Sequence, residues 1–181
     1  EYGLLPPKGV LSHVTVFELP MYHKLLVVSD VAVIPYPDLS QKTAIVRYLT
    51  ATAKVLGVEC PKIAAIAPSE QLLASVQSSV EAAVLAKMAD RGQLGDVVLD
   101  GPLALDVALF EEVARTKHLS SPVAGDADCL LMPNLDAANV FFKSANHLCN
   151  ASLAAMVAGT KAPCVLTSRG DSAESKLYSI A

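Results

Sequence analysis

The 181-residue chain contains no tryptophan, and aromatic residues make up only 5% of it and charged residues only 18%. It has no uninterrupted apolar run of about 18 residues, which a membrane-spanning helix needs. Its first residues, Glu1 to Pro7, lack the basic start and apolar stretch of a signal peptide. With 52% hydrophobic residues, the composition predicts a core-rich cytoplasmic protein with no membrane partner.

Positive charge is also scarce, with 14 basic against 18 acidic residues and a net charge of −4. A protein that coats nucleic acid needs clustered Lys and Arg to replace counterions, so no nucleic-acid partner is expected. Glycine-rich phosphate loops of the P-loop or G-x-G-x-x-G type are absent as well. This absence argues against direct binding of ATP or NAD and favours other small-molecule partners.

The four cysteines stand far apart with no C-x-x-C pair, and each lies among apolar residues. We therefore expect Cys60, Cys129, Cys149 and Cys164 to be buried, reduced thiols and not disulfides or metal ligands. The four histidines show no metal-ligand spacing either. His13 in a strand is expected to be satisfied by hydrogen bonds or to lie at an edge, so no histidine is assigned to catalysis.

Short apolar runs alternate with helical patterns, which is typical of α/β folds with a mainly parallel sheet between helices. Asp38 and Gln41 have the spacing of a capping box and predict a helix that ends at Gly57. The expected strands are 13–18, 25–34, 62–67, 96–99, 129–132 and 164–166. The expected helices are 38–57, 72–88, 103–117, 136–149, 152–158 and 171–180.

One boundary in the chain is predicted near Cys149 to Gly159. It would separate an α/β series, residues 1–151, from a C-terminal helix-strand-helix segment, residues 152–181. We expect the second segment to belong to a different layer of the molecule.

The most promising chemistry lies in Thr167-Ser168-Arg169-Gly170-Asp171-Ser172, which follows an apolar run and opens a helix. Free backbone N–H groups, two hydroxyls and a guanidinium at such a position form a plausible phosphate or oxyanion site. The alternative is that Ser168 or Asp171 only caps the helix and Arg169 is a solvated surface residue.

Two other clusters flank predicted strands, and the second continues into the helix that follows its strand. Asp100-Gly101-Pro102 leads into a helix with Asp106 in its first turns, where the carboxylate has an ordinary helix-dipole explanation. Gly125-Asp126-Ala127-Asp128 precedes a strand. Asn139 and Lys143 share one helix face, and such a polar pair is more often solvated than functional.

Taken in order, these segments resemble the phosphate acetyl/butyryltransferase family, and most of all its butyryltransferase-like branch. The resemblance covers nearly the whole chain from about Leu11 onward. It rests on Asp30, Lys62-Ile63-Ala64, Asp100 to Asp106, Val123 to Asp128, Pro133-Asn134, Asn139, Lys143, Pro163 to Arg169, Asp171-Ser172 and Lys176 to Ala181.

The resemblance implies reversible acyl transfer between coenzyme A and inorganic phosphate, without a metal or other cofactor, in a homodimer. It also implies a two-domain architecture like that of isocitrate and isopropylmalate dehydrogenases, of which the first domain is largely missing here. Segment 152–181 would then belong to that first domain. The implied catalytic residues are Ser168, Arg169, Asp171 and Glu174. The implied substrate-binding residues are Thr167, Gly170, Ser172, Asp100, Gly101, Pro102, Gly125, Asn139 and Lys143.

The chain departs from the family pattern at several positions. Ser175 stands where the acetyltransferase branch has an acidic thiol base, so Asp171 or Glu174 would have to replace that base. Ala138 and Ala155 occupy positions where relatives often have glycine. These departures leave two alternatives open: a non-catalytic module for acyl-CoA binding or assembly, and a remnant completed by self-association.

Overall fold

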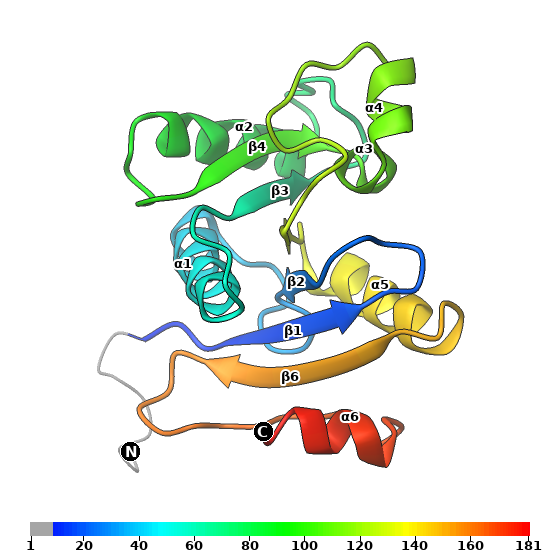
Figure 1. The fold of residues 1–181 in the computed structure, drawn as a ribbon. Coiled ribbons are helices and arrows are strands. Elements are labelled where there is room, and N and C mark those ends of the chain that lie inside the picture. Colours follow the sequence, from blue (N-terminus) through cyan, green and yellow to red (C-terminus); the bar gives the residue numbers. More distant parts are fainter. Residues whose placement is uncertain (1–8) are drawn as a thin grey trace.

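The computed structural model describes residues 9–181, and its sheet has six strands in the order β4-β3-β5-β2-β1-β6 (Figure 1). The strands are β1 (Ser12–Glu18), β2 (Leu26–Ser29), β3 (Lys62–Ile66), β4 (Val98–Leu103), β5 (Cys129–Leu131) and β6 (Ser152–Ala158). The helices are α1 (Leu39–Val55), α2 (Gln77–Asp90), α3 (Leu105–Leu109), α4 (Glu111–Thr116), α5 (Leu135–His147) and α6 (Ala173–Tyr178). The stretch Glu1 to Pro7 lies outside the described residues.

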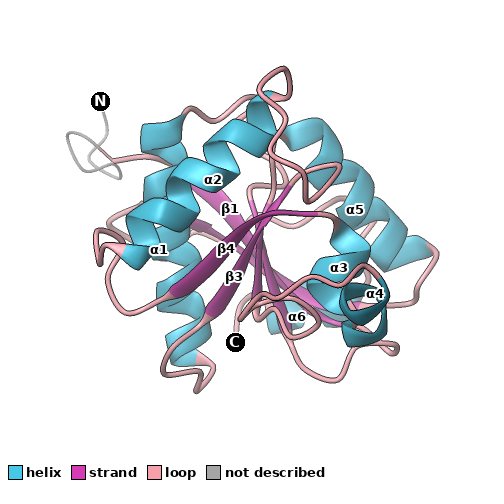
Figure 2. Cartoon of the chain, turned by 90° about the horizontal axis from the view of Figure 1, so that it is seen from above, coloured by secondary structure: helices cyan, strands magenta, loops and turns pink. Residues whose placement is uncertain are grey.

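The sheet is mainly parallel, as predicted. Strands β2, β5, β3 and β4 pair in parallel, and β1 runs antiparallel to both of its neighbours, β2 and β6. Helices α1 and α2 cover one face, and α3, α4 and α5 cover the other (Figure 2). The predicted three-layer α/β/α fold is therefore confirmed.

Each face of the sheet has its own apolar core. Ile45, Leu49 and Leu85 of α1 and α2 are fully buried against one face, while Phe142 of α5 and Val107 of α3 pack against the other. The capping box of α1 is present: the Gln41 N–H donates to Asp38 Oδ1 at 2.8 Å, and the Asp38 N–H donates to Gln41 Oε1 at 2.9 Å. The strands β2 and β5 are buried along their whole length because helices cover both faces of the sheet, which agrees with their short apolar runs in the sequence.

The prediction of a helix over 152–158 is wrong, because these residues form β6. Leu153, Ala155 and Val157 point into the molecule, and all seven residues pair with β1, from Ser12↔Ala158 to Glu18↔Ser152. The high helix propensity of alanine is overridden here by pairing with a neighbouring strand.

The prediction of a strand over 164–166 is also wrong. This segment is irregular and exposed. Two hydrogen bonds tie it to the sheet: the Val157 N–H donates to the Cys164 carbonyl at 2.8 Å, and His13 Nε2 contacts the Leu166 carbonyl at 2.8 Å. Segment 152–181 is thus strand, irregular chain and short helix, not helix-strand-helix. Its assignment to a first domain stays a prediction.

Elsewhere the structure shifts or divides predicted elements. β4 extends through Gly101-Pro102, where the prediction had a break; as an edge strand it tolerates proline, which has no N–H. The helix expected over 103–117 is divided into α3 and α4 because Phe110 between them is extended. β2 is shorter than predicted and ends at Ser29, and α2 begins later, at Gln77.

The prediction of four buried cysteines holds for Cys129 alone. Cys60, Cys149 and Cys164 are free and exposed, because each lies in a loop outside the strands and helices that build the core. Burial raises the pKa of the Cys129 thiol, so that side chain is an inert core residue.

No helix within residues 9–181 combines the length and the apolar character needed to cross a membrane.

Candidate active site

Residues 168–171 form a turn beside α5, held by the carboxylate of Asp171. The Ser168 N–H donates to Asp171 Oδ2 at 2.7 Å, and the Asn146 side-chain amide donates to Asp171 Oδ1 at 3.1 Å. The Asp171 side chain is buried, so these hydrogen bonds satisfy it away from water. Ser172 caps α6, where its Oγ accepts the Ser175 N–H at 3.0 Å. The turn is therefore fixed at both ends.

A cavity of about 390 Å³, here named the turn cavity, lies between this turn, α5, β1 and the loop after β2. Lys143 Nζ donates to Ser168 Oγ at 3.1 Å across it, and Asn139 Nδ2 donates to the Val31 carbonyl at 3.2 Å. Its lining residues are His13, Val31, Ala32, Asn139, Phe142, Lys143, Leu166, Thr167, Ser168 and Arg169.

The turn cavity carries net positive charge. Among the described residues, neither Lys143 nor Arg169 forms an ion pair with a carboxylate. The nearby Asp30 carboxylate accepts the backbone N–H groups of Ala32, Val33 and Ile34 at 2.9–3.0 Å and forms no ion pair with either cation in the described residues. Two cations and a hydroxyl facing one cavity can bind and orient an anion.

His13 lies on β1 and is the site residue whose role sequence reasoning missed. Its Nε2–H donates to the Leu166 carbonyl at 2.8 Å, which leaves Nδ1 to accept the Thr15 hydroxyl at 3.2 Å. Burial lowers the pKa of His13, and the hydrogen bond to Leu166 opposes this shift only in part. The expectation of a satisfied histidine is met, but the contact joins residues 153 positions apart and has no local signal.

Three other predicted or compared positions near the turn, Gly170, Glu174 and Ser175, do not line the turn cavity. Glu174 lies on the exposed side of α6, where Oε1 accepts the Tyr178 hydroxyl at 2.6 Å, and it does not line the turn cavity. Gly170 is exposed, and no atom lies within 4 Å of the place that an added Cβ would occupy. Ser175 is buried in the first turn of α6, where its N–H donates to Ser172 Oγ.

Asp100, Gly101 and Pro102 are not brought to the turn cavity. They lie in β4, at the opposite edge of the sheet from β6, and the Gly101 N–H donates to Asp100 Oδ1 at 2.8 Å. A Cβ at Gly101 would lie 2.8 Å from both the Cβ and the carbonyl oxygen of Ala65. Close packing of β4 on β3 explains this glycine without a ligand.

Gly125 does not line the turn cavity either. It precedes β5, at the amino end of that strand. Its φ is +77°, and an added Cβ would lie 2.5 Å from the Glu111 Cα. A positive φ together with backbone contact explains the glycine structurally.

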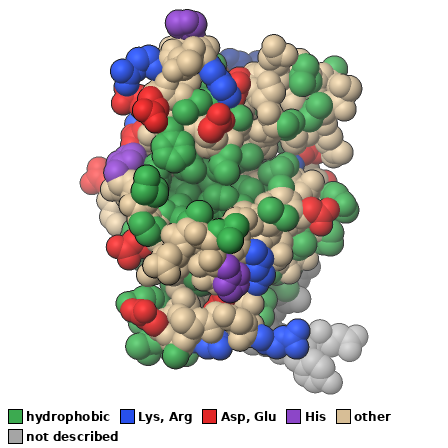
Figure 3. Space-filling model, turned by 90° about the vertical axis from the view of Figure 1, so that its right-hand side faces the viewer, with side chains coloured by type: hydrophobic (Ala, Val, Ile, Leu, Met, Phe, Trp, Pro, Cys, Tyr) green, Lys and Arg blue, Asp and Glu red, His purple; other side chains and the backbone are tan. Residues whose placement is uncertain are grey.

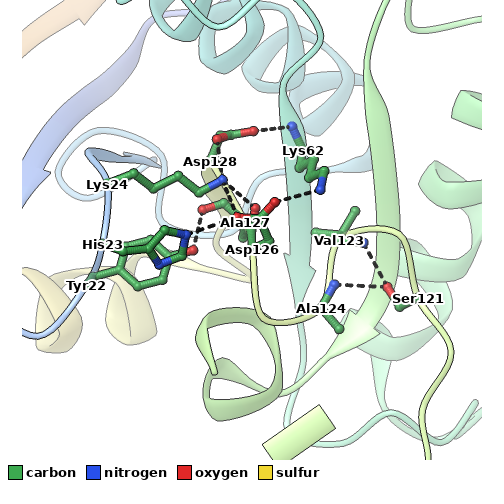
Figure 4. Close-up of polar contacts among 10 residues, drawn as sticks. All are labelled: Tyr22, His23, Lys24, Lys62, Ser121, Val123, Ala124, Asp126, Ala127 and Asp128. Carbon is green, nitrogen blue, oxygen red and sulfur yellow. Dashed lines mark hydrogen bonds and ion pairs between the residues drawn. The ribbon is translucent and has the colours of Figure 1, made fainter. Parts of the chain in front are cut away.

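The residues after Gly125 form an ion-pair cluster that joins three segments of the chain (Figure 4). The Asp126 carboxylate contacts Lys62 Nζ at 2.6 Å, Lys24 Nζ at 2.8 Å and His23 Nε2 at 3.1 Å. Asp128 accepts the Lys62 N–H at 2.8 Å. Burial works to raise the pKa of Asp126, but the hydrogen bonds outweigh it and hold this pKa well below its usual range. The cluster is internally neutralised and ties the loop before β2 to the amino ends of β3 and β5.

No group of three or more His, Cys, Asp or Glu side chains within residues 9–181 is arranged to hold a metal ion.

Comparison with known families matches residues 3–181 to the family described as phosphate acetyl/butaryl transferase. Phosphate butyryltransferase from Clostridium beijerinckii is 43% identical over 181 residues, which are 100% of this chain and 60% of that protein. Phosphate acetyltransferase from Thermotoga maritima is 41% identical over 181 residues, again 100% of this chain and 61% of that protein. The solved branched-chain phosphotransacylase from Enterococcus faecalis V583 has a TM-score of 0.88 and 37% identity, covering 98% of this chain and 63% of that one.

The chain thus spans about three fifths of the length of these curated relatives. The match extends over the turn at Ser168 and the whole six-stranded sheet. The chain belongs to the phosphate acetyl/butaryl transferase family.

Proposed function

We propose that the protein carrying this chain transfers a short acyl group, butyryl or acetyl, between coenzyme A and inorganic phosphate. The observation that carries the proposal is the turn cavity, where Lys143 and Arg169 flank the Ser168 hydroxyl without a carboxylate partner among the described residues. Phosphate is a dianion near neutral pH, and two cations with a hydroxyl suit its oxygens. The names of the relatives support the same reaction class.

In the proposed reaction a phosphate oxygen attacks the thioester carbon, a C–O bond forms, and the C–S bond breaks. Arg169 and Lys143 orient the phosphate, and Ser168 with Arg169 stabilises the oxyanion that develops on the carbonyl. Coenzyme A leaves as a thiolate and takes up a proton. In reverse, the thiol must lose that proton before attacking the acyl phosphate.

The other site residues support this centre in different ways. We propose that Asp171 positions the turn, since both of its oxygens are already used. Thr167 and Asn139 line the turn cavity and help shape it around substrate. Ser172 and Gly170 set the start of α6. Glu174 is the candidate for managing the thiol proton. Asp100, Gly101, Pro102 and Gly125 are assigned to packing of the sheet.

Release of coenzyme A from butyryl-CoA and phosphate by the complete protein tests the proposal. Arg169→Gln removes a cation that contacts charge in the transition state and should cost about 2–4 kcal/mol, or roughly 30- to 1,000-fold in kcat/KM. Arg91→Gln, an exposed arginine after α2, is the matched control and should retain full activity. The proposal fails if the complete protein releases no coenzyme A, or if Arg169→Gln matches the control.

The described residues offer no observation that favours the non-catalytic alternatives. We propose that no metal or other cofactor takes part, so activity should survive dialysis against EDTA. Loss of activity that returns with one added metal ion would contradict this.

We further propose that the protein is a homodimer and that residues 152–181 pack against the family's first domain. On the face that carries α3, α4 and α5, Figure 3 shows hydrophobic side chains gathered in a central hollow. Val140 and Leu148 of this side are 67% and 82% exposed, which is a suitable surface for a second copy. Leu177 and Ile180 of the C-terminal segment are similarly exposed and suit contact with another domain.

Light scattering of the complete protein would test the dimer. Val140→Glu should shift the mass toward a monomer, whereas Leu72→Glu, an exposed residue before α2, should not. A cytoplasmic location is part of the same proposal, because three exposed free thiols suit a reducing compartment. Cell fractionation would test it.

A further inference from the structure

The sheet has a point where consecutive helices leave in opposite directions. β3 and β5 are parallel neighbours, but α2 follows β3 onto one face and α5 follows β5 onto the other (Figures 1 and 2). Divergence of this kind leaves a crevice outside the carboxyl ends of the two strands, and open α/β sheets bind ligands there. The turn cavity does not occupy this position, because residues 160–172 lie outside β6.

A cavity of about 590 Å³, here named the switch-point crevice, lies at this point. Its volume is within the range of about 300–1,000 Å³ that is typical of small-molecule sites. Elements α1, α2, β3, α3 and α5 all contribute to its wall. The residues that matter most for its chemistry are Lys42, Ile66, Glu81, Leu105, Pro133 and Asn134.

Lys42 and Glu81 are the only charged residues that line the switch-point crevice. Lys42 Nζ donates to Glu81 Oε2, with side-chain exposures of 5% and 15%. Gln77 Nε2 donates to the other carboxylate oxygen at 2.8 Å. A buried ion pair gives little net stability over well-packed apolar residues, so stability is a poor reason for placing one in this wall.

The pair offers a hydrogen-bond donor and an acceptor side by side. The Lys42 ammonium has three N–H groups, of which one is engaged by Glu81 and none by any other described residue. The Glu81 carboxylate retains lone pairs beyond its two hydrogen bonds. The rest of the wall is mostly apolar, with Ile66, Leu105 and Pro133 around the pair.

The net charge of the crevice wall indicates which kinds of ligand the crevice can bind. Its lining is neutral overall, so a phosphate or another anion would be buried without a compensating charge. A zwitterion would match both partners but would bring two further charges out of water. A secondary amide presents a carbonyl to Lys42 and an N–H to Glu81 at no such cost.

We infer that the switch-point crevice is a second binding site, separate from the turn cavity, for an uncharged aliphatic chain carrying a secondary amide. The two cavities lie on different sides of α5: Ala137 lines the crevice, while Asn139 and Lys143 line the turn cavity. The loop between β2 and α1 joins them, with Val31 at one cavity and Tyr36 at the other. The amide chain belongs either to the pantetheine arm of coenzyme A or to a separate small amide.

Pantetheine is the probe, because it carries two secondary amides and no net charge. Isothermal titration of the complete protein should show saturable binding. Replacing the pair by apolar residues of similar size, Lys42→Met with Glu81→Leu, should weaken binding at least tenfold without leaving a buried charge unpaired. The matched control is Lys87→Met with Asp90→Leu, which removes an exposed ion pair from the same helix and should leave the Kd unchanged.

A second measurement does not depend on the folding of the double variant. Leu105→Trp gives a chain without other tryptophans a single reporter at the crevice wall. Pantetheine should change its emission saturably, and pantothenate, which carries a carboxylate, should not at the same concentration. The inference is overturned if pantetheine gives no saturable signal, if pantothenate acts equally, or if a folded pair variant keeps the wild-type Kd.

Competition by coenzyme A identifies the source of the amide. Displacement of pantetheine by coenzyme A assigns the crevice to the arm of that molecule, and undisturbed binding assigns it to a separate amide. Both results uphold the site. Neither depends on acyl transfer, so pantetheine binding in a protein that releases no coenzyme A would leave this inference standing while the proposed reaction fails.

Discussion

The Asp171 carboxylate accepts the backbone N–H of Ser168 at 2.7 Å, so the serine proposed to contact substrate is held by a side chain three positions later. The same carboxylate accepts Asn146 of α5 at 3.1 Å. A short turn outside the sheet is thereby fixed to a helix of the core. Asp171 and Asn146 therefore hold the turn, whereas Ser168 and Arg169 are the residues proposed to contact substrate.

Asp171→Asn should lower turnover at every pH, because an amide cannot accept from both donors and the turn loosens. A hydrogen bond to a charged group contributes about 1.5–3 kcal/mol, so we expect a loss of roughly 10- to 100-fold in kcat. Glu174→Gln should instead remove an ionisation from the pH dependence of kcat. A pH–rate profile of both variants checks this. Loss of the ionisation in Asp171→Asn alone would assign proton transfer to Asp171.

His13→Gln should remove a pH dependence of stability. The folded pKa of His13 is lowered by burial, while in the unfolded chain it is about 6.5, so protonation favours unfolding. Wild-type stability from this group is therefore present above about pH 6.5 and is lost as the pH falls below it. Glutamine keeps an N–H for the Leu166 carbonyl but does not titrate.

Urea unfolding at pH 7.5 and pH 5.5 would measure this difference. The drop in free energy of unfolding should be smaller in His13→Gln than in wild type, and His147→Gln, an exposed change on α5, should behave as wild type. An equal drop in His13→Gln and wild type would rule the interpretation out.

Asp126→Asn should destabilise the fold most at neutral pH. The folded pKa of Asp126 is held below its unfolded value of about 3.9, so its stabilising effect is present above that pH and declines as the pH falls through the folded value. The side chain is 42% exposed, which limits the expected loss to about 1 kcal/mol at pH 7. Denaturant midpoints at pH 7 and pH 3 provide the measurement.

Asp96→Asn is the control for this prediction, because Asp96 is 91% exposed and its ion pair with Lys54 spans 3.7 Å. It should change stability little at either pH. A loss in Asp126→Asn that is as large at pH 3 as at pH 7 would show that the charge is not responsible.

A thiol reagent should distinguish the cysteines. Cys60, Cys149 and Cys164 are exposed and should react with Ellman's reagent in the native protein, whereas Cys129 should react only after unfolding. The expected stoichiometry for these residues is three fast thiols and one slow thiol. A Cys129→Ser variant should lose the slow phase alone.

The sequence predicted those parts of the fold that depend on local pattern. Periodicity and capping located α1, and apolar runs located β1, β3 and β5 within a residue or so. Asp38 and Gln41 sufficed for a helix start because both partners lie within one turn. The predictions were wrong where residues far apart in the sequence determine the structure. The alanines of β6, for example, form a strand because they pair with β1.

The site divided in the same way. The run of hydroxyl, guanidinium and glycine predicts a site at Ser168 and Arg169, whereas a role for Lys143 follows only from the family resemblance. The tie from His13 to Leu166 and the ion pair of Lys42 with Glu81 join separate elements, so no spacing in the sequence signals them. Gly101 and Gly125 show the reverse case. The family resemblance implies substrate binding at both, whereas contact of an added Cβ with Ala65 or Glu111 gives each glycine a packing explanation that the sequence does not reveal.

The C-terminal segment covers the free edge of β6, so cleavage within this segment should expose that edge. The Ala155 N–H of β6 donates to Ser179 Oγ at 2.9 Å and the Val157 N–H donates to the Cys164 carbonyl, so the chain covers its own sheet edge. The covering segment also contains Ser168 and Arg169. We expect a protease cut between Gly159 and Thr167 to free one end of the segment that covers this edge and to expose the edge to strand exchange, while the hydrogen bond of Asn146 to Asp171 still holds the turn to α5.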